Sequence, residues 1–174
     1  WNPQCLLEAA QGICGNHDDQ YGGFGEAPKF PPSMTLNFLR ALRPAVESGL
    51  AARIDEVSRI TLRAMAHGGL FDQFGGGFAR YSVDAHWLIP HFEKMLYDNG
   101  QILSLFARAL QFGPDQLFED AITQTIDWLE RDLRHSKGGF FSSVDADSSG
   151  EEGAFYAWRR EELKKILTED QYLL

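Results

Sequence analysis

Cysteine, histidine and long apolar runs are scarce in this 174-residue chain. Its two cysteines, Cys5 and Cys14, form no CxxC pair and fall on the apolar side of one predicted helix, where thiols behave as small hydrophobic groups. Five scattered histidines without an HExxH motif suggest no zinc site, and no P-loop is present, so we expect neither a metal nor another cofactor. No apolar run is long enough to span a bilayer, and we expect a soluble, cytoplasmic protein without a membrane partner.

Basic residues are also in deficit: 16 stand against 25 acidic ones, for a formal net charge of −9. Because affinity for nucleic acid rests largely on cationic contacts with phosphates, this balance argues against a nucleic-acid partner. Hydrophobic residues make up 44% of the chain, enough for one domain with a sizeable core. The first residue is Trp1 and not an initiator methionine, so we expect processing or a longer parent protein.

Hydrophobic residues recur at helical spacing along most of the chain. The periodicity predicts helices over residues 4–14, 33–44, 50–67, 92–111 and 114–135, with a short sixth helix near 163–167. The ends of the third and fifth helices agree with this pattern, because a cationic last turn followed by Gly-Gly suits both the helix dipole and a left-handed cap. We therefore expect an all-α protein.

A Gly-Gly-apolar sequence follows every second predicted helix, at 22–24, 68–70 and 138–140, with a further copy at 76–78. This pattern indicates helical hairpins whose longer loops share one rim. Such hairpins bury their apolar faces against one another, either in an open solenoid or in a closed α/α toroid. We favour the toroid, because aromatic, glycine-rich loops on one rim suit a ligand mouth. About three hairpins are visible, so we expect either a longer parent protein or self-association.

The stretch from Gly75 to Asn99 and the residues just before it combine glycines, aromatic rings and charged side chains. Consecutive glycines permit positive φ and close approach of a ligand. Flat rings suit the apolar faces of sugars, and charged groups suit sugar hydroxyls. The candidate substrate-binding residues in this region are Asp72, Arg80, Tyr81 and Trp87.

Pro90 predicts a helix start that places His91, Glu93 and Lys94 in the first turn, with Asp98 five residues after Glu93. A helix N-terminus presents unpaired amides and a partial positive charge, which suit a carboxylate and help to orient an imidazole. His91, Glu93 and Asp98 are therefore candidates for acid–base catalysis. The alternatives are an ordinary first-turn acid for Glu93, a capping or core histidine for His91, and an ion-paired or solvated Lys94.

An acidic segment, residues 142–153, begins as a calcium-binding loop does, with Asp145 and Asp147 at its first and third positions. The match then fails, because Tyr156 stands where a bidentate Glu is needed. We favour an acidic turn between two short strands, Gly139–Val144 and Ala154–Trp158. If this turn faces the ligand mouth, Asp145 and Asp147 become candidates for catalysis or for binding hydroxyls.

The segment 18–32 contains paired aspartates and a lysine between apolar neighbours. Asp18 and Asp19 precede Gly-Gly in a loop, whereas a magnesium–diphosphate site needs acids one turn apart on a helix. Lys29 is a candidate for contacting a hydroxylated or anionic ligand, with a rigid connector as the alternative role.

Three blocks, GGFGEAPKFPP, GGLFDQFGGGFARYSVDAHWLIPHFEKMLYDNG and GGFFSSVDADSSGEEGAFYAW, closely resemble successive parts of one family. It is the thioredoxin-domain-containing family called spermatogenesis-associated in animals and YyaL-like in bacteria. The resemblance implies an N-terminal thioredoxin-like domain followed by a six-hairpin toroid similar to N-acylglucosamine 2-epimerases and six-hairpin glycosidases. It makes residues 1–174 the first part of that toroid, without the thioredoxin-like domain and the later hairpins.

Two classes of function follow. The first is a fragment of a carbohydrate-active protein with a small, sugar-like ligand, either a sugar epimerase or isomerase or a glycosidase-like hydrolase. Paired carboxylates favour hydrolysis, whereas paired histidines on opposite sides of the ligand mouth favour epimerisation. The second is a non-catalytic binding or scaffold toroid coupled to a thioredoxin-like domain. Convergence of Arg80, His91, Glu93 and Asp98 with the 145–147 turn favours catalysis, and dispersal favours the scaffold.

Overall fold

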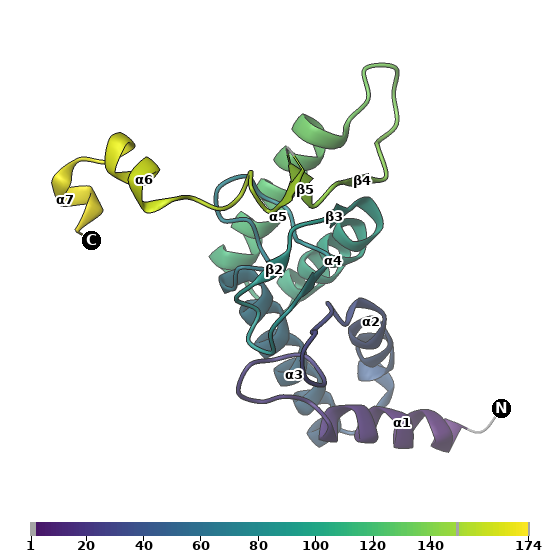
Figure 1. Ribbon diagram of the computed structural model, residues 1–174. Helices are drawn as coiled ribbons and strands as arrows, with labels where there is room; N and C mark the ends of the chain where they lie inside the picture. The colour runs from purple at the N-terminus through teal and green to yellow at the C-terminus, as the bar shows by residue number, and fades with distance from the viewer. Residues whose placement is uncertain (1–2, 149, 174) are drawn as a thin grey trace.

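The computed structural model describes residues 3–148 and 150–173 (Figure 1). Its α-helices are α1 (Pro3–Gly15), α2 (Ser33–Leu42), α3 (Ser48–His67), α4 (Leu96–Ala109), α5 (Gln116–Trp128), α6 (Arg160–Ile166) and α7 (Glu169–Tyr172). Two 3₁₀ segments, η1 (Arg43–Ala45) and η2 (Leu110–Phe112), extend α2 and α4, and a π-helical turn, η3 (Leu129–Leu133), extends α5. The predicted helices are confirmed, with a later start for the fourth. Within the described ranges, no helix is long and apolar enough to cross a membrane.

The helices pack in two rows. In one row α1 contacts α3 and α3 contacts α5, and in the other α2 contacts α4, while α2–α3 and α4–α5 contacts join the rows. This is the arrangement of consecutive helical hairpins, and it buries the apolar stripes that the periodicity predicts. The core residues between the rows include Leu36, Leu39, Ile54, Leu62, Met65, Ile102, Phe106 and Phe118.

Side-chain caps set the starts of α3 and α5. The Glu47 carboxylate accepts hydrogen bonds from the amides of Gly49 and Leu50 at the start of α3, and the Asp115 carboxylate accepts one from Leu117 at the start of α5. These carboxylates satisfy amides that lack a partner within the helix. Beyond the hairpins, α6 and α7 form an arm that projects from the body (Figure 1).

Glycine is required at two positions of the Gly-Gly pairs, because of positive φ or because no space is left for a Cβ. Gly76 has φ +78°, and a Cβ there would lie 2.1 Å from the carbonyl oxygen of Gln124. At Gly69 the φ is ordinary, but a Cβ would lie 2.1 Å from the carbonyl oxygen of Leu88. The loops therefore pack against α5 and against each other more closely than any side chain permits.

Six two-residue strands form three antiparallel pairs. They are β1 (Tyr81–Ser82) with β2 (Pro90–His91), β3 (Lys94–Met95) with β4 (Ser143–Val144), and β5 (Asp147–Ser148) with β6 (Glu151–Glu152). An isolated bridge between Lys29 and Ser82 sets the 29–30 segment on the other side of β1. The 29–30 segment, far upstream in sequence, thus lies side by side with β1 and β2.

Three local predictions are wrong. Residues 90–95 are extended, so His91, Glu93 and Lys94 do not lie in a helical first turn. The reason is that His91 pairs with Tyr81 in an antiparallel strand pair, which holds this segment extended. The 139–144 strand is reduced to β4 and pairs with β3, while 154–158 forms turns and not a strand. Cys5 is exposed, and only Cys14 faces the core.

Candidate functional site

A column of three rings crosses the extended segments. The Phe30 and Tyr81 rings stack with centroids 4.7 Å apart, and the Tyr81 and His91 rings stack at the same separation with an interplanar angle of 17°. Side chains alternate between the faces of a strand, so the pairing of 29–30, β1 and β2 sets these rings on a shared face. Phe30 ends the column and is 52% exposed. Our sequence reasoning missed Phe30, although its alternation with Lys29 between prolines was the available signal.

The His91 imidazole lies between two carboxylates, one of which holds it by a hydrogen bond. Its Nδ1 lies 2.7 Å from Glu152 Oε1, and its Nε2 lies 3.9 Å from Glu93 Oε2. A carboxylate accepts hydrogen bonds and donates none, so Nδ1 carries the proton of the neutral ring and Nε2 carries the lone pair. Within the described residues Nε2 has no hydrogen-bond partner. The ring is therefore oriented with a basic atom free to take up a proton.

Glu93 is held in place by Arg80. The Arg80 guanidinium donates to Glu93 Oε2 at 2.9 Å, and the Arg80 amide donates to the Glu93 carbonyl at 2.8 Å. The hydrogen bond to Glu93 is the largest cause that raises the pKa of Arg80. A fixed cation thus lies beside the two candidate acid–base residues.

Asp98 lies in the first turn of α4 with an unusual carboxyl group. Its Oδ2 is buried and has no hydrogen-bond partner in the described part of the chain. Burial raises the pKa of Asp98, against the lowering effects of the Arg80 charge and a hydrogen bond with Tyr97. The negative charge of Glu93 adds to the increase. Asp98 therefore keeps its proton to higher pH than an ordinary aspartate does.

Asp72 and Lys94 form a buried ion pair. Lys94 is 3% exposed, and its Nζ donates to Asp72 Oδ2 at 2.8 Å and to the Gly76 carbonyl at 2.7 Å. Burial lowers the pKa of Lys94. Burial acts to raise the pKa of Asp72, but donation by the Gly75 amide and by Lys94 lowers it overall. The ion pair is one of the roles expected for Lys94. Because these donors already engage Asp72, its carboxylate stabilises the loop. Asp72 also lines a cavity, and its predicted role toward a ligand stays a prediction.

Trp87 and Lys29 are buried and do not have the substrate-binding role that the sequence predicted for them. Trp87 is fully buried with φ 65°, and its Nε1 donates to the Tyr21 carbonyl at 2.9 Å. Lys29 is 1% exposed, and its Nζ donates to Asp18 Oδ2 at 2.7 Å and to the Ala85 carbonyl at 3.0 Å. Neither side chain offers surface to a ligand. The alternative role for Lys29, a rigid connector, agrees with this geometry.

Asp145 and Asp147 remain outside the cluster around His91. Both are exposed, and the Asp145 carboxylate accepts from the Asp147 amide at 3.1 Å. The hairpin that begins at Asp147 nevertheless returns through Glu152, which binds His91. Ser149, part of the calcium-loop interpretation, lies outside the described residues. Within the described ranges, no group of three or more His, Cys, Asp or Glu side chains is arranged to hold a metal ion.

A cavity of about 250 Å³ lies beside the same extended segment. Phe92 and Lys94 line it, and these residues alternate with His91 and Glu93, which do not. The Tyr156 and Phe92 rings stack with their centroids 5.3 Å apart, and both line the cavity together with Phe74. The 90–94 segment therefore separates a polar, ring-lined face from an apolar cavity.

Comparison with solved structures defines the class of fold. A cellobiose 2-epimerase from Spirochaeta thermophila matches 82% of this chain with a TM-score of 0.62 and 21% identity, and the match covers 40% of that protein. A sugar epimerase from a ruminal bacterium matches 80% of this chain with a TM-score of 0.63 and 12% identity, covering 37% of that protein. The predicted α/α toroid is confirmed. At these identities the likeness shows the fold alone.

Sequence comparison defines the family. Spermatogenesis-associated protein 20 of the rat is 40% identical over 97% of this chain. The chain is thus homologous to the thioredoxin-domain-containing, spermatogenesis-associated family, and the resemblance in the three sequence blocks is confirmed. It spans 22% of the length of the rat protein. A search of protein-family models found no match.

Proposed function

We propose that this chain supplies one wall of a sugar-binding site in an epimerase-like or isomerase-like protein. The observation that carries the proposal is the His91 imidazole, whose Nδ1 is held by Glu152 while no residue that the structure describes forms a hydrogen bond with Nε2. A histidine fixed in this tautomer is suited to remove a proton from a carbon beside a carbonyl group. The proton passes to Nε2, and the electron pair moves onto the carbonyl oxygen of the open-chain sugar.

The groups around His91 suit that chemistry. Arg80 and Glu93 form a fixed pair beside Nε2, and Asp98 is the carboxyl group whose raised pKa suits donation of a proton. Epimerisation needs a second group on the opposite face of the substrate. We assign that group to a later hairpin of a longer polypeptide or to a second copy of the chain.

The ring column provides the binding surface. Phe30 is 52% exposed at the end of the column, so its free face suits the apolar face of a sugar ring. Tyr81 and His91 continue the stack toward the acid–base cluster. We also place the protein in the cytoplasm, a location with which its two free thiols, Cys5 and Cys14, agree.

Two alternatives remain as outcomes of the test. A glycosidase-like hydrolase is favoured by the number of carboxyl groups near His91, with Asp98 as general acid. A non-catalytic toroid coupled to a thioredoxin-like domain is favoured by how much of the 68–99 segment serves packing, as Trp87 and Asp72 illustrate.

The test uses the complete natural polypeptide that carries this sequence, incubated in D₂O with cellobiose and with a panel of reducing sugars. We expect deuterium at C2 and formation of the C2 epimer by NMR, with both lost in His91→Gln. His67→Gln is the matched control, because His67 is exposed at the end of α3. Release of monosaccharide without deuterium at C2 would establish the hydrolase. Sugar binding without either reaction would establish the scaffold, and an absence of binding across the panel would overturn the proposal.

A further inference from the structure

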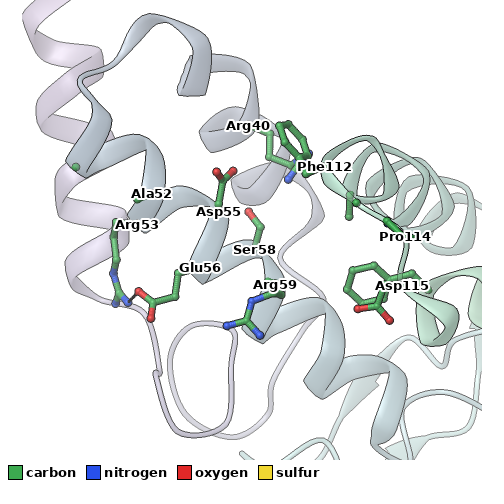
Figure 2. Close-up of a pocket in the computed structure, with 14 residues that line it drawn as sticks. Arg40, Ala52, Arg53, Asp55, Glu56, Ser58, Arg59, Phe112, Pro114 and Asp115 are labelled. Carbon is green, nitrogen blue, oxygen red and sulfur yellow. Dashed lines mark hydrogen bonds and ion pairs between the residues drawn. The ribbon is translucent and has the colours of Figure 1, made fainter.

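A groove lies at the other end of α3 from the loop that carries His91. Its volume is about 720 Å³, within the range of small-molecule sites. The groove follows residues 49–59, in the first half of α3, whereas the 68–95 loop follows the end of the helix. The opposite wall is formed by the turn from α4 to α5, including Phe112 and Pro114 (Figure 2). No residue of the His91 cluster lines it.

Every acid that lines the groove is paired with an arginine, and Arg53, the partner of Glu56, also binds Asp19. Asp55 accepts two hydrogen bonds from Arg43, both at 2.7 Å. Glu56 accepts one from Arg53 at 2.9 Å. Asp115 binds Arg63 at 2.5 Å. Arginines of the chain therefore neutralise the carboxylates of the groove.

Two further arginines line the groove without a carboxylate partner. Among the described residues, Arg59 makes no hydrogen bond or ion pair, and Arg40 donates only to the Arg108 carbonyl, at 3.0 Å. Figure 2 shows Arg59 on α3 and Arg40 beside Phe112. Counting the lining residues and their ion-pair partners, five arginines stand against four acids: Arg40, Arg43, Arg53, Arg59 and Arg63 against Asp19, Asp55, Glu56 and Asp115. The excess of positive charge is local, because the chain as a whole carries a formal charge of −9.

The wall opposite α3 is apolar. Phe112 is 55% exposed, and the guanidinium groups of Arg40 and Arg43 lie over its ring at 4.6 and 4.7 Å. Ala109, Pro114 and Phe118 continue this wall. A groove with unused guanidinium donors and an apolar wall suits a ligand with one anionic group and a carbon skeleton.

We propose that this groove binds a phosphate monoester of a sugar or a similar small polyol. A phosphate dianion offers three acceptor oxygens that match the fork of donors on Arg59, with Arg40 adding charge. The carbon skeleton lies against Phe112 and Pro114. The site does not depend on the reaction proposed at His91, since the two share no residue.

The test is calorimetric titration of the complete natural polypeptide with inorganic phosphate, glycerol 3-phosphate and glucose 6-phosphate. We expect the two esters to bind more tightly than inorganic phosphate. Arg59→Ala should weaken ester binding about tenfold or more, and Arg59→Lys should weaken it less, because lysine keeps the charge but loses the fork. Arg40→Lys extends the test without removing the side chain that contacts Phe112.

Two controls make the outcome decisive. Arg134→Ala removes an exposed arginine elsewhere, on the residue after η3, and should leave binding unchanged. His91→Gln should also leave it unchanged, so a failure of the proposed function does not affect this result. An absence of saturable binding of all three probes up to about 10 mM, unchanged binding in Arg59→Ala, or loss of binding in His91→Gln would each overturn the proposal. Equal affinity for inorganic phosphate and the esters would overturn the role of the apolar wall.

Discussion

His91 Nδ1 lies 2.7 Å from Glu152 Oε1, although 61 residues separate the two in sequence. The contact joins the β2 strand to the β5–β6 hairpin, which follows the third Gly-Gly loop. It decides which ring nitrogen carries the proton and directs the other toward Glu93. The 142–153 segment therefore contributes a positioning carboxylate, and the contributing residue is Glu152 rather than Asp145 or Asp147.

Replacing Glu152 with Ala should change the tautomer of His91 without unfolding the protein. Glu152 is 53% exposed, so the loss of stability should stay below about 1 kcal/mol. Because Glu152 fixes the tautomer in which Nε2 is the base, its loss should lower activity by up to the roughly 10²–10⁴-fold that general acid–base catalysis contributes. Nitrogen-15 NMR of the imidazole measures the tautomer directly, independently of any activity. Glu151→Gln is the neighbouring control, and an unchanged His91 spectrum in Glu152→Ala would contradict the assignment.

Asp98→Asn should raise stability at neutral pH. Because the folded-state pKa is raised, the folded protein binds more protons than the unfolded chain between pH 3.8 and that pKa, so stability falls across this interval and the loss is complete above it. Because an amide carries no charge, Asp98→Asn removes this loss. The free energy of unfolding should rise by about 1 kcal/mol at pH 7, and this gain should disappear below pH 3.8. Urea denaturation at several pH values measures it. If Asp98 is the proton donor, activity should fall in the same variant, and equal stability of both proteins at pH 7 would argue against an unpaired buried carboxyl.

Lys94→Met should destabilise the fold by about 3 kcal/mol, because it leaves Asp72 partly buried without its cation. Adding Asp72→Asn should recover part of that loss, since the unpaired charge is then removed. Arg134→Ala, which breaks an exposed pair with Glu130, should change stability by about 0.5 kcal/mol or less. Chemical denaturation of the four proteins checks the series. A Lys94→Met variant as stable as Arg134→Ala would show that the pair is not buried in solution.

Gly76→Ala should be among the most damaging single substitutions in the loops. The left-handed backbone alone costs about 1–2 kcal/mol for a residue with a Cβ, and the contact with the Gln124 carbonyl adds to that. Gly25→Ala is a matched control: Gly25 has φ +73° but no atom within 4 Å of the added Cβ. Thermal unfolding should show a clearly larger loss for Gly76→Ala. Equal losses would mean that the loop moves away from α5 at little cost.

The helices were predictable from the sequence because their signal is local. A repeat of apolar residues near 3.6, with glycine after the last turn, predicts where a helix lies whatever packs against it. The start of α4 was missed for the opposite reason. Pro90 is compatible with a helix start, and only pairing of His91 with Tyr81 makes residues 90–91 extended.

The residues of the candidate site also divide into those that the sequence predicted and those that only the structure revealed. Residue type and the 68–99 block selected Arg80, Tyr81, His91, Glu93 and Asp98, and these residues do lie in one region of the fold. Sequence did not reveal that Trp87 and Lys29 are buried, because aromatic and cationic side chains serve either a ligand or a core. It also missed Phe30 and Glu152, whose roles arise from pairing between distant segments.

The sequence by itself thus determined the helical hairpins, their glycine-rich rim and the family, since each depends on local pattern or on long matching blocks. The tertiary structure alone decided which polar groups are consumed by packing and which remain free. The reason is physical: a buried charge must have a partner, and contacts across the fold decide which group that is, as the pairing of Lys94 with Asp72 shows.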